Sequence, residues 1–180
     1  MKKIFSGLIM LSIILSLGGC VKTAKTAVED YLAMYTALDE KVLSDMENIV
    51  ETENLTDENK SVYEAIFKKQ YQDLSYEITN EEYSGDEATI TAKISVYDLY
   101  KAQNDANNYL SLHPDEFNDE KGVYDVQKFF EYKLEQMKNT TDKVEYTIDF
   151  YVVKTGNNWV VSSLSNTDLE KIHGIYDYEA

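Results

Sequence analysis

The sequence predicts a single α+β domain, in which an antiparallel sheet built of two hairpins carries helices on one face. Three observations lead to this prediction. Apolar residues before position 75 recur at three- and four-residue steps, as they do in amphipathic helices. The spacing changes to strict alternation in two separate stretches, each interrupted by a glycine-containing turn. The predicted elements follow the order ααββααββα, with no internal repeat and no low-complexity segment.

Two helices are predicted first. One long helix over residues 28–49 has a single apolar stripe, formed by Val28, Leu32, Tyr35, Leu38, Val42, Met46 and Ile49. Thr26 and Glu29 fit a capping box at its start, because a hydroxyl and a carboxylate at this spacing can bind free backbone N–H groups. Residues 54–57 predict a break. A second helix follows over residues 62–74, with Ser61 as an alternative first residue.

The first hairpin comes next, with strands over residues 76–79 and 88–97 and a turn at 84–86. Its second strand alternates apolar residues (Ala88, Ile90, Ala92, Ile94, Val96) with polar ones, which indicates one buried and one solvated face. Helical spacing returns over residues 99–110 and stops before Pro114, because the residue before proline disfavours the helical conformation.

The rest of the chain repeats this order. Residues 115–122 are predicted to form a polar loop, and Asp125 is expected to cap a helix over residues 126–137. The second hairpin has strands over 144–152 and 159–161, joined by a turn at Gly156. A short last helix opens at Thr167 and is expected to end at Gly174.

The N-terminus carries a separate signal. Lys2 and Lys3 precede 14 uncharged, mostly apolar residues at positions 4–17, a length that is too short to cross a bilayer core of about 20 residues. The quartet Leu-Gly-Gly-Cys at 17–20 resembles the lipobox of bacterial lipoproteins. The resemblance implies cleavage between Gly19 and Cys20 and acylation of Cys20, whereas an uncleaved signal anchor is the alternative interpretation.

These patterns divide the chain into a signal peptide at 1–19, a lipidated tether at 20–25 and one α+β domain at 26–180. The expected location is the extracytoplasmic face of the cell membrane, with the membrane as a partner through the lipid on Cys20. Five extended residues after this cysteine reach at most about 17 Å, so the domain is expected to lie close to the bilayer.

Composition excludes several classes of function. The formal net charge is −16, and all 17 basic residues are lysines, which argues against nucleic-acid binding because phosphates require a basic face. One cysteine excludes a disulfide framework, and isolated glycines provide no phosphate-binding loop. Neither His113 nor His173 has a second ligand at metal-binding spacing, and the acidic residues 115–122 do not fit an EF-hand. We therefore expect no cofactor, no metal and no catalytic set.

Four residues are candidates for lining a pocket. Tyr76 and Tyr146 lie on predicted apolar faces, Trp159 begins the last strand, and Asp98 follows the inward-facing Val96. A carboxylate in an apolar cavity has a raised pKa and can act as a general base. The alternatives are that the tyrosines only fill the core and that Asp98 caps the following helix.

The helices, the hairpins and the late segment at 154–161 (Lys-Thr-Gly-Asn-Asn-Trp-Val-Val) together resemble the cystatin-like cone of the nuclear-transport-factor-two-like superfamily. The helical pair between residues 99 and 137 departs from the simplest form of that fold. The resemblance implies a non-catalytic module that binds a small ligand or a partner protein. It also leaves open an isomerase or cyclase that uses Asp98. The acidic charge, separately, leaves open an inhibitor or immunity-type protein whose acidic face covers a basic partner.

Overall fold

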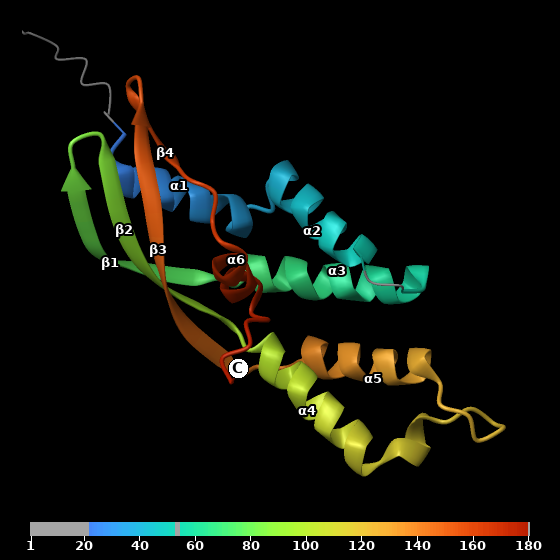
Figure 1. Cartoon of the computed structure of the whole chain (residues 1–180). Coiled ribbons are helices and arrows are strands. Elements are labelled where there is room, and N and C mark those ends of the chain that lie inside the picture. Colours follow the sequence, from blue (N-terminus) through green and yellow to red (C-terminus); the bar gives the residue numbers. More distant parts are fainter. Residues whose placement is uncertain (1–21, 53–54, 180) are drawn as a thin grey trace, which may run out of the picture.

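The computed structural model describes residues 22–52 and 55–179, so the predicted signal peptide and Cys20 lie outside the described residues. The fold is α+β, as predicted, with one antiparallel sheet in the strand order β1-β2-β3-β4 (Figure 1). The strands are β1 (Ser75–Ser84), β2 (Glu87–Tyr97), β3 (Lys143–Thr155) and β4 (Asn158–Val161). The α-helices are α1 (Ala24–Thr36), α2 (Glu40–Thr52), α3 (Asp57–Gln72), α4 (Leu99–Leu112), α5 (Val126–Asn139) and α6 (Asn166–His173).

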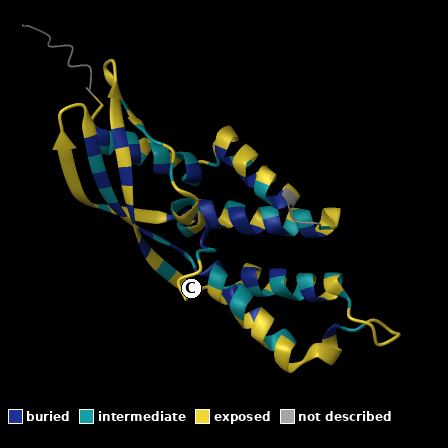
Figure 2. Ribbon diagram, in the orientation of Figure 1, coloured by how far each residue is buried: buried dark blue, intermediate teal, exposed yellow. Residues whose placement is uncertain are grey.

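Both predicted hairpins are confirmed, and they join into one sheet because β2 pairs with β3 along its whole length. Every second residue of these two central strands is buried, and the residues between them are mostly exposed or half-buried (Figure 2). The helices cover the buried face only, where Ile90 and Phe150 lie in the core with Leu32 of α1 and Phe67 of α3. The other face meets solvent.

The predicted long helix over residues 28–49 is wrong in one respect, because it is two helices. The chain turns between α1 and α2 at Leu38, which has a φ of 53°. The Asp39 N–H donates to the Met34 carbonyl at 2.9 Å, and its side chain accepts from the Lys41 N–H at 3.0 Å. The apolar stripe continues through the turn because both helices pack against the same core. Spacing alone therefore does not reveal the break.

The three predicted helix starts that rested on hydroxyl residues are each displaced. The side chain of Thr23 caps α1 by accepting from the Thr26 N–H, so Thr26 is not the cap. Likewise, Thr56 caps α3 and Ser165 caps α6, in place of Ser61 and Thr167. In each case the hydroxyl residue that caps the helix lies earlier in the chain, and the predicted one lies within the helical turns that follow.

Between β2 and β3 the chain forms a helical arm, which we define as residues 99–139: α4, the 3-10 helix η1 (Pro114–Phe117) and α5. The two helices lie side by side and project away from the sheet (Figure 1). The prediction of a polar loop at 115–122 is wrong for Phe117, which is only 4% exposed. Its ring packs with Ala106 and Phe129 in a second, small hydrophobic cluster at the far end of the arm.

The last helix ends at Gly174 as predicted, in the left-handed conformation with a φ of 72°. A Cβ at this position would overlap both the Gln70 side chain and the Tyr97 carbonyl, so only glycine fits. Of the helices within the described residues, none is long and apolar enough to cross a membrane.

Candidate functional site: the groove between α3 and α5

Two of the four predicted pocket residues lie in one row across the sheet. Tyr76 of β1 pairs with Ile94 of β2, which pairs in turn with Tyr146 of β3. Tyr146 is buried, whereas Tyr76 lies on the edge strand and is 37% exposed. The buried hydroxyl of Tyr146 has no hydrogen-bond partner among the described residues. Burial, followed by the charge of Asp98, raises the pKa of this hydroxyl.

Trp159 lies at the other end of the sheet. It pairs with Lys154, which is eight residues along β3 from Tyr146, a distance of roughly 26 Å at the usual rise per residue. Its ring contacts that of Tyr83, with 5.9 Å between centroids. The structure therefore brings Tyr146 near Asp98 but does not bring Trp159 to them.

Asp98 is 7% exposed, and both of its carboxylate oxygens have partners. Oδ1 accepts from the Lys101 N–H at 2.9 Å, which makes Asp98 the N-cap of α4, and Oδ2 accepts from the Tyr178 hydroxyl at 2.9 Å. Burial and this bond to Asp98 raise the pKa of Tyr178 to about 12. The carboxylate thus joins the end of β2, the start of α4 and the C-terminal segment, as the capping interpretation anticipated.

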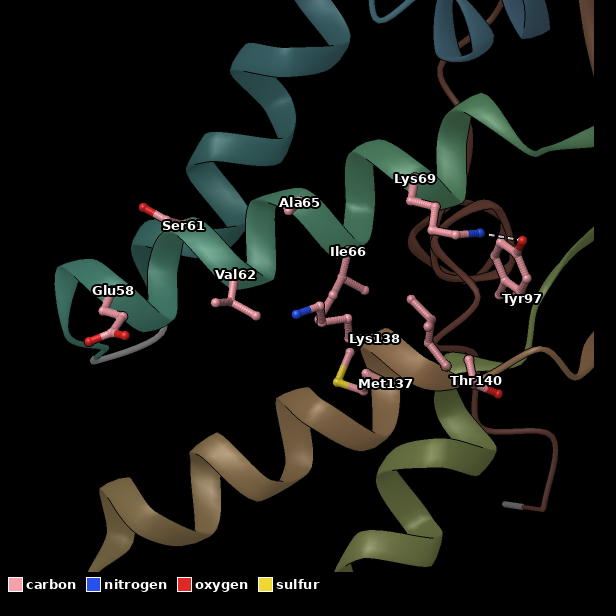
Figure 3. A pocket seen from close by; sticks show the side chains of 11 residues that line it. Glu58, Ser61, Val62, Ala65, Ile66, Lys69, Tyr97, Met137, Lys138 and Thr140 are labelled. Atoms are coloured by element: carbon pink, nitrogen blue, oxygen red, sulfur yellow. Dashed lines mark hydrogen bonds between the residues drawn. The ribbon is translucent and has the colours of Figure 1, made fainter.

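A concave site lies away from these four residues, in a groove of about 570 Å³ between α3 and the last turn of α5 (Figure 3). One wall is a stripe along α3, and the other combines the end of α5 with the β2–α4 junction. The lining residues are Glu58, Ser61, Val62, Ala65, Ile66, Lys69, Tyr97, Leu99, Met137, Lys138 and Thr140. We call this site the α3–α5 groove.

The floor of the groove is apolar because α3 has apolar residues on two sides. One side, which includes Phe67 and Tyr71, is buried in the core against the sheet and α6. The other side presents Val62, Ala65 and Ile66 to the groove. The arm meets α3 only in part, so this second apolar side is left as the floor of a cleft instead of being covered.

The position of α3 is fixed by a buried amide. Gln70 is 1% exposed, and its side chain pairs with the backbone of Tyr97 at the end of β2. The Tyr97 N–H donates to Gln70 Oε1 at 2.9 Å, and Gln70 Nε2 donates to the Tyr97 carbonyl at 3.1 Å. Two hydrogen bonds in opposite directions lock the helix against the strand end, so one wall of the groove is rigid.

The inner end of the groove is closed by a charged network. The Lys69 ammonium donates to Asp73 at 2.6 Å and to the Tyr97 hydroxyl, and it lies 3.8 Å from the centre of the Tyr97 ring (Figure 3). The hydrogen bonds from Lys69 and Tyr97 lower the pKa of the Asp73 carboxyl. Lys69 is therefore held in place at the end of the apolar floor, with its charge shared among several partners.

Lys138 provides a second cation. Its side chain reaches from α5 across the groove toward Ile66 (Figure 3), and among the described residues it forms no hydrogen bond or ion pair. Beyond it the groove continues into a shallower hollow with Glu58, Glu131 and Glu135. Lys138 lines this hollow as well, so its ammonium lies between the apolar floor and the three carboxylates.

The lining of the groove is mostly apolar, with a few polar side chains. No histidine or cysteine lines the groove, and the Ser61 hydroxyl already donates to the Asp57 carbonyl at 3.1 Å. His173 is buried outside it, where its Nδ1 shares a hydrogen bond of 2.9 Å with the Tyr71 hydroxyl. Across residues 22–52 and 55–179, no three His, Cys, Asp or Glu side chains are grouped to hold a metal ion.

Sequence reasoning did not identify this groove. It assigned Val62, Ile66, Leu99 and Met137 to helical core positions, and it did not single out Lys69 or Lys138. The available signal is the width of the apolar surface on α3, where Tyr63, Phe67 and Tyr71 form one side and Val62 and Ile66 another. Comparison with known proteins adds no relative, because no family model, curated protein or solved structure matches this chain significantly.

Proposed function

We propose that this protein is a membrane-anchored extracytoplasmic lipoprotein whose single domain, of the nuclear-transport-factor-two-like type, is a non-catalytic binding module. The lipobox-like residues 17–20 support the anchor. The four-stranded antiparallel sheet with helices on one face supports the domain type.

The α3–α5 groove is the binding site in this proposal, and its ligand is a small amphipathic molecule with an apolar body and an acidic head. The main observation behind this proposal is the open apolar floor of the groove beside Lys138, which forms no ion pair within the described residues. Val62, Ile66 and Met137 provide contact for the apolar body, and Lys138 provides the cation for the head. Such a pocket, apolar with a few placed polar groups, is the usual form of a small-molecule site.

The geometry of Asp98 supports a role without catalysis. Both oxygens of Asp98 accept hydrogen bonds from the protein, one as the N-cap of α4 and one from the Tyr178 hydroxyl, so the carboxylate already has a structural role. Asp98 also does not line the α3–α5 groove.

Native mass spectrometry on the full-length protein, purified from its host in detergent, tests the binding site. The variant Ala65→Trp fills the groove from an exposed position, and Ala33→Trp places the same ring on an exposed position of α1 outside it. We expect extra mass that is lost on denaturation in the wild type and in Ala33→Trp, and none in Ala65→Trp. Equal bound mass in all three proteins, or no bound mass in any, would contradict the proposed site.

The anchor has its own test. Cys20→Ala removes the only thiol in the chain, and with it the acceptor for the lipid. We expect this variant to remain unprocessed or to leave the membrane fraction, whereas Cys20→Ala protein that is cleaved normally and sediments with membranes would exclude the lipoprotein interpretation.

A further inference from the structure

Several large apolar side chains are exposed together where the two hairpins turn. Tyr83, Tyr151, Val153 and Val160 are 50%, 64%, 39% and 48% exposed, and half-buried Trp159 lies against Tyr83. Tyr151, Val153 and Val160 lie on the solvated face of the sheet, whereas Tyr83 and Trp159 lie on the face that carries α1, so the five residues surround the end of the sheet from both sides. We call these five residues the sheet tip. Apolar side chains on both faces of one end indicate a contact surface, because the rest of the solvated sheet face is polar or charged.

The sheet tip lies beside the start of the described chain. The Tyr83 hydroxyl donates to the Glu81 carboxylate at 3.1 Å, and the same carboxylate lies 3.5 Å from the ammonium of Lys25 in the first turn of α1. Lys22 borders a hollow of about 430 Å³ together with Trp159 and Val160. Lys22 follows Cys20 by two residues, a reach of about 7 Å at most.

The chemistry of these side chains fits the headgroup region of a bilayer. Tyrosine and tryptophan prefer this layer because their rings have an apolar body and a polar edge. Lys154 lies 6.0 Å from the Trp159 ring centre, and Lys22 and Lys25 belong to the adjacent end of α1.

Three of the acidic residues nearby are paired with lysines, whereas Glu82 and Glu87, which line a hollow with Tyr83, Tyr151 and Val153, form no ion pair within the described residues. Lys22 pairs with Asp30 at 2.6 Å, Lys25 with Glu81 at 3.5 Å, and Lys154 with Asp86 at 3.8 Å. Contact with lipid then depends on the aromatic and β-branched side chains, and the net charge of the whole chain does not prevent it. The contact is shallow, since Glu87 and Glu82 at the tip stay in water.

We propose that the sheet tip rests in the headgroup layer of the membrane that holds the anchor, with the rings of Trp159 and Tyr83 among the headgroups. This inference rests on the proposed lipidation of Cys20. It gives the domain a fixed orientation in which the far end of the helical arm points away from the bilayer (Figure 1). Leu112, at that far end, is also exposed, but it lies far from the start of α1 and stays in water.

The chain contains its own probe, because Trp159 is its only tryptophan. The full-length, lipidated protein is reconstituted into vesicles of phosphatidylcholine and phosphatidylglycerol, with and without bromine on the lipid chains. We expect brominated lipid to quench most of the Trp159 emission. We expect acrylamide in the water to quench the emission of the vesicle-bound protein less than that of the unfolded protein without detergent. The matched control combines Trp159→Phe with Leu112→Trp, which moves the probe to the far end of the arm, where brominated lipid should not quench it.

Flotation of the vesicles separates failure of this inference from failure of the anchor. If the protein floats with the vesicles but Trp159 is quenched only by acrylamide, the sheet tip does not contact lipid and the inference is wrong, although the anchor holds. If the Leu112→Trp probe is quenched as strongly as Trp159, the proposed orientation is wrong. If the protein does not float at all, the lipid anchor itself fails, and this inference fails with it.

Discussion

The sheet with its covering helices and the helical arm are stabilised in different ways. The buried face of the sheet, α1, α2, α3 and α6 share one continuous core, which also includes Leu99, Leu134 and Met137 at the root of the arm. The far end of the arm depends on a separate cluster of three buried side chains, Ala106, Phe117 and Phe129, with aromatic neighbours. The arm is therefore anchored at one end and held by its own small core at the other.

This difference indicates a gradient of local stability along the arm. Because hydrophobic stabilisation scales with buried apolar area, the far end can open without unfolding the sheet. The α3–α5 groove lies between the two regions, where one wall belongs to the main core and the other to the arm. The two regions should therefore respond separately to substitution.

The largest effect is expected in the main core. Phe150 is fully buried on β3, and Phe150→Ala leaves a cavity that should lower the free energy of unfolding by about 4 kcal/mol. Chemical denaturation followed by far-ultraviolet circular dichroism measures this. The sheet and the arm should lose structure together, because the arm has its root in the same core. An arm that remained folded after the sheet had unfolded would contradict the comparison.

The second effect is a pH dependence from the buried centre of the main core. Burial lowers the pKa of His173 from 6.5 to about 4, with the charge of Asp45 opposing the shift in part. Between these two pH values the unfolded chain binds a proton at His173 and the folded chain does not. The contribution of neutral His173 to the free energy of unfolding is therefore fully present above pH 6.5 and is lost as the pH falls toward 4.

Proton linkage converts this difference in the pKa of His173 into a loss of about 3 kcal/mol in the free energy of unfolding. Denaturant titrations across this range should show the slope in the wild type. His173→Gln keeps a polar partner for Tyr71 but cannot titrate, so its slope should be shallower by that amount. The same slope in both proteins would mean that His173 is not buried as a neutral side chain.

A third and smaller effect should be confined to the arm. Phe117→Ala removes the centre of the small cluster and should cost about 2 kcal/mol, less than in the main core because the partly exposed neighbours can collapse into the space. Hydrogen exchange should speed up at the amides around Ala106 and Phe129, and the amides of β2 and β3 should keep their protection. Faster exchange throughout the sheet would show that the two regions form one cooperative unit.

The smallest effect concerns the joint between the two regions. Asp98→Ala removes the N-cap of α4 and the partner of Tyr178, and should cost somewhat more than about 1 kcal/mol. Asp125→Ala is the matched control, since Asp125 caps α5 through the Gln127 and Lys128 N–H groups and holds no distant segment. If the two thermal melting shifts were equal, the Asp98–Tyr178 bond would contribute nothing.

The sheet was predictable because alternation in β2 and β3 records burial directly, residue by residue. The break at Leu38 was not, because neither glycine nor proline marks it and the stripe continues on both sides. The burial of Phe117 was not predictable either. It stands alone among polar residues, and only the packing of α4 against α5 creates the space that buries it.

The candidate site was less accessible to sequence reasoning than the fold. Asp98 was correctly anticipated as a possible cap from its place between a strand and a helix. The groove depends on how closely α5 approaches α3, which is set by contacts between residues about 70 positions apart, such as Asn59 with Gln127. These contacts cannot be read from the sequence alone, so the apolar residues that line the groove are predicted to lie in the core.

The edge strand β1 has a consequence for a protein held at a surface. Anchored molecules share two dimensions instead of three, so exposed strand edges meet far more often than they do in solution. β1 breaks its register between Ile78 and Asn80 and presents Glu77, Glu81 and Glu82, features that discourage a second sheet from pairing with it. The opposite edge, β4, has only 4 residues. Both sheet edges thus discourage pairing with another copy of this chain, including copies that the proposed anchor would hold in one membrane.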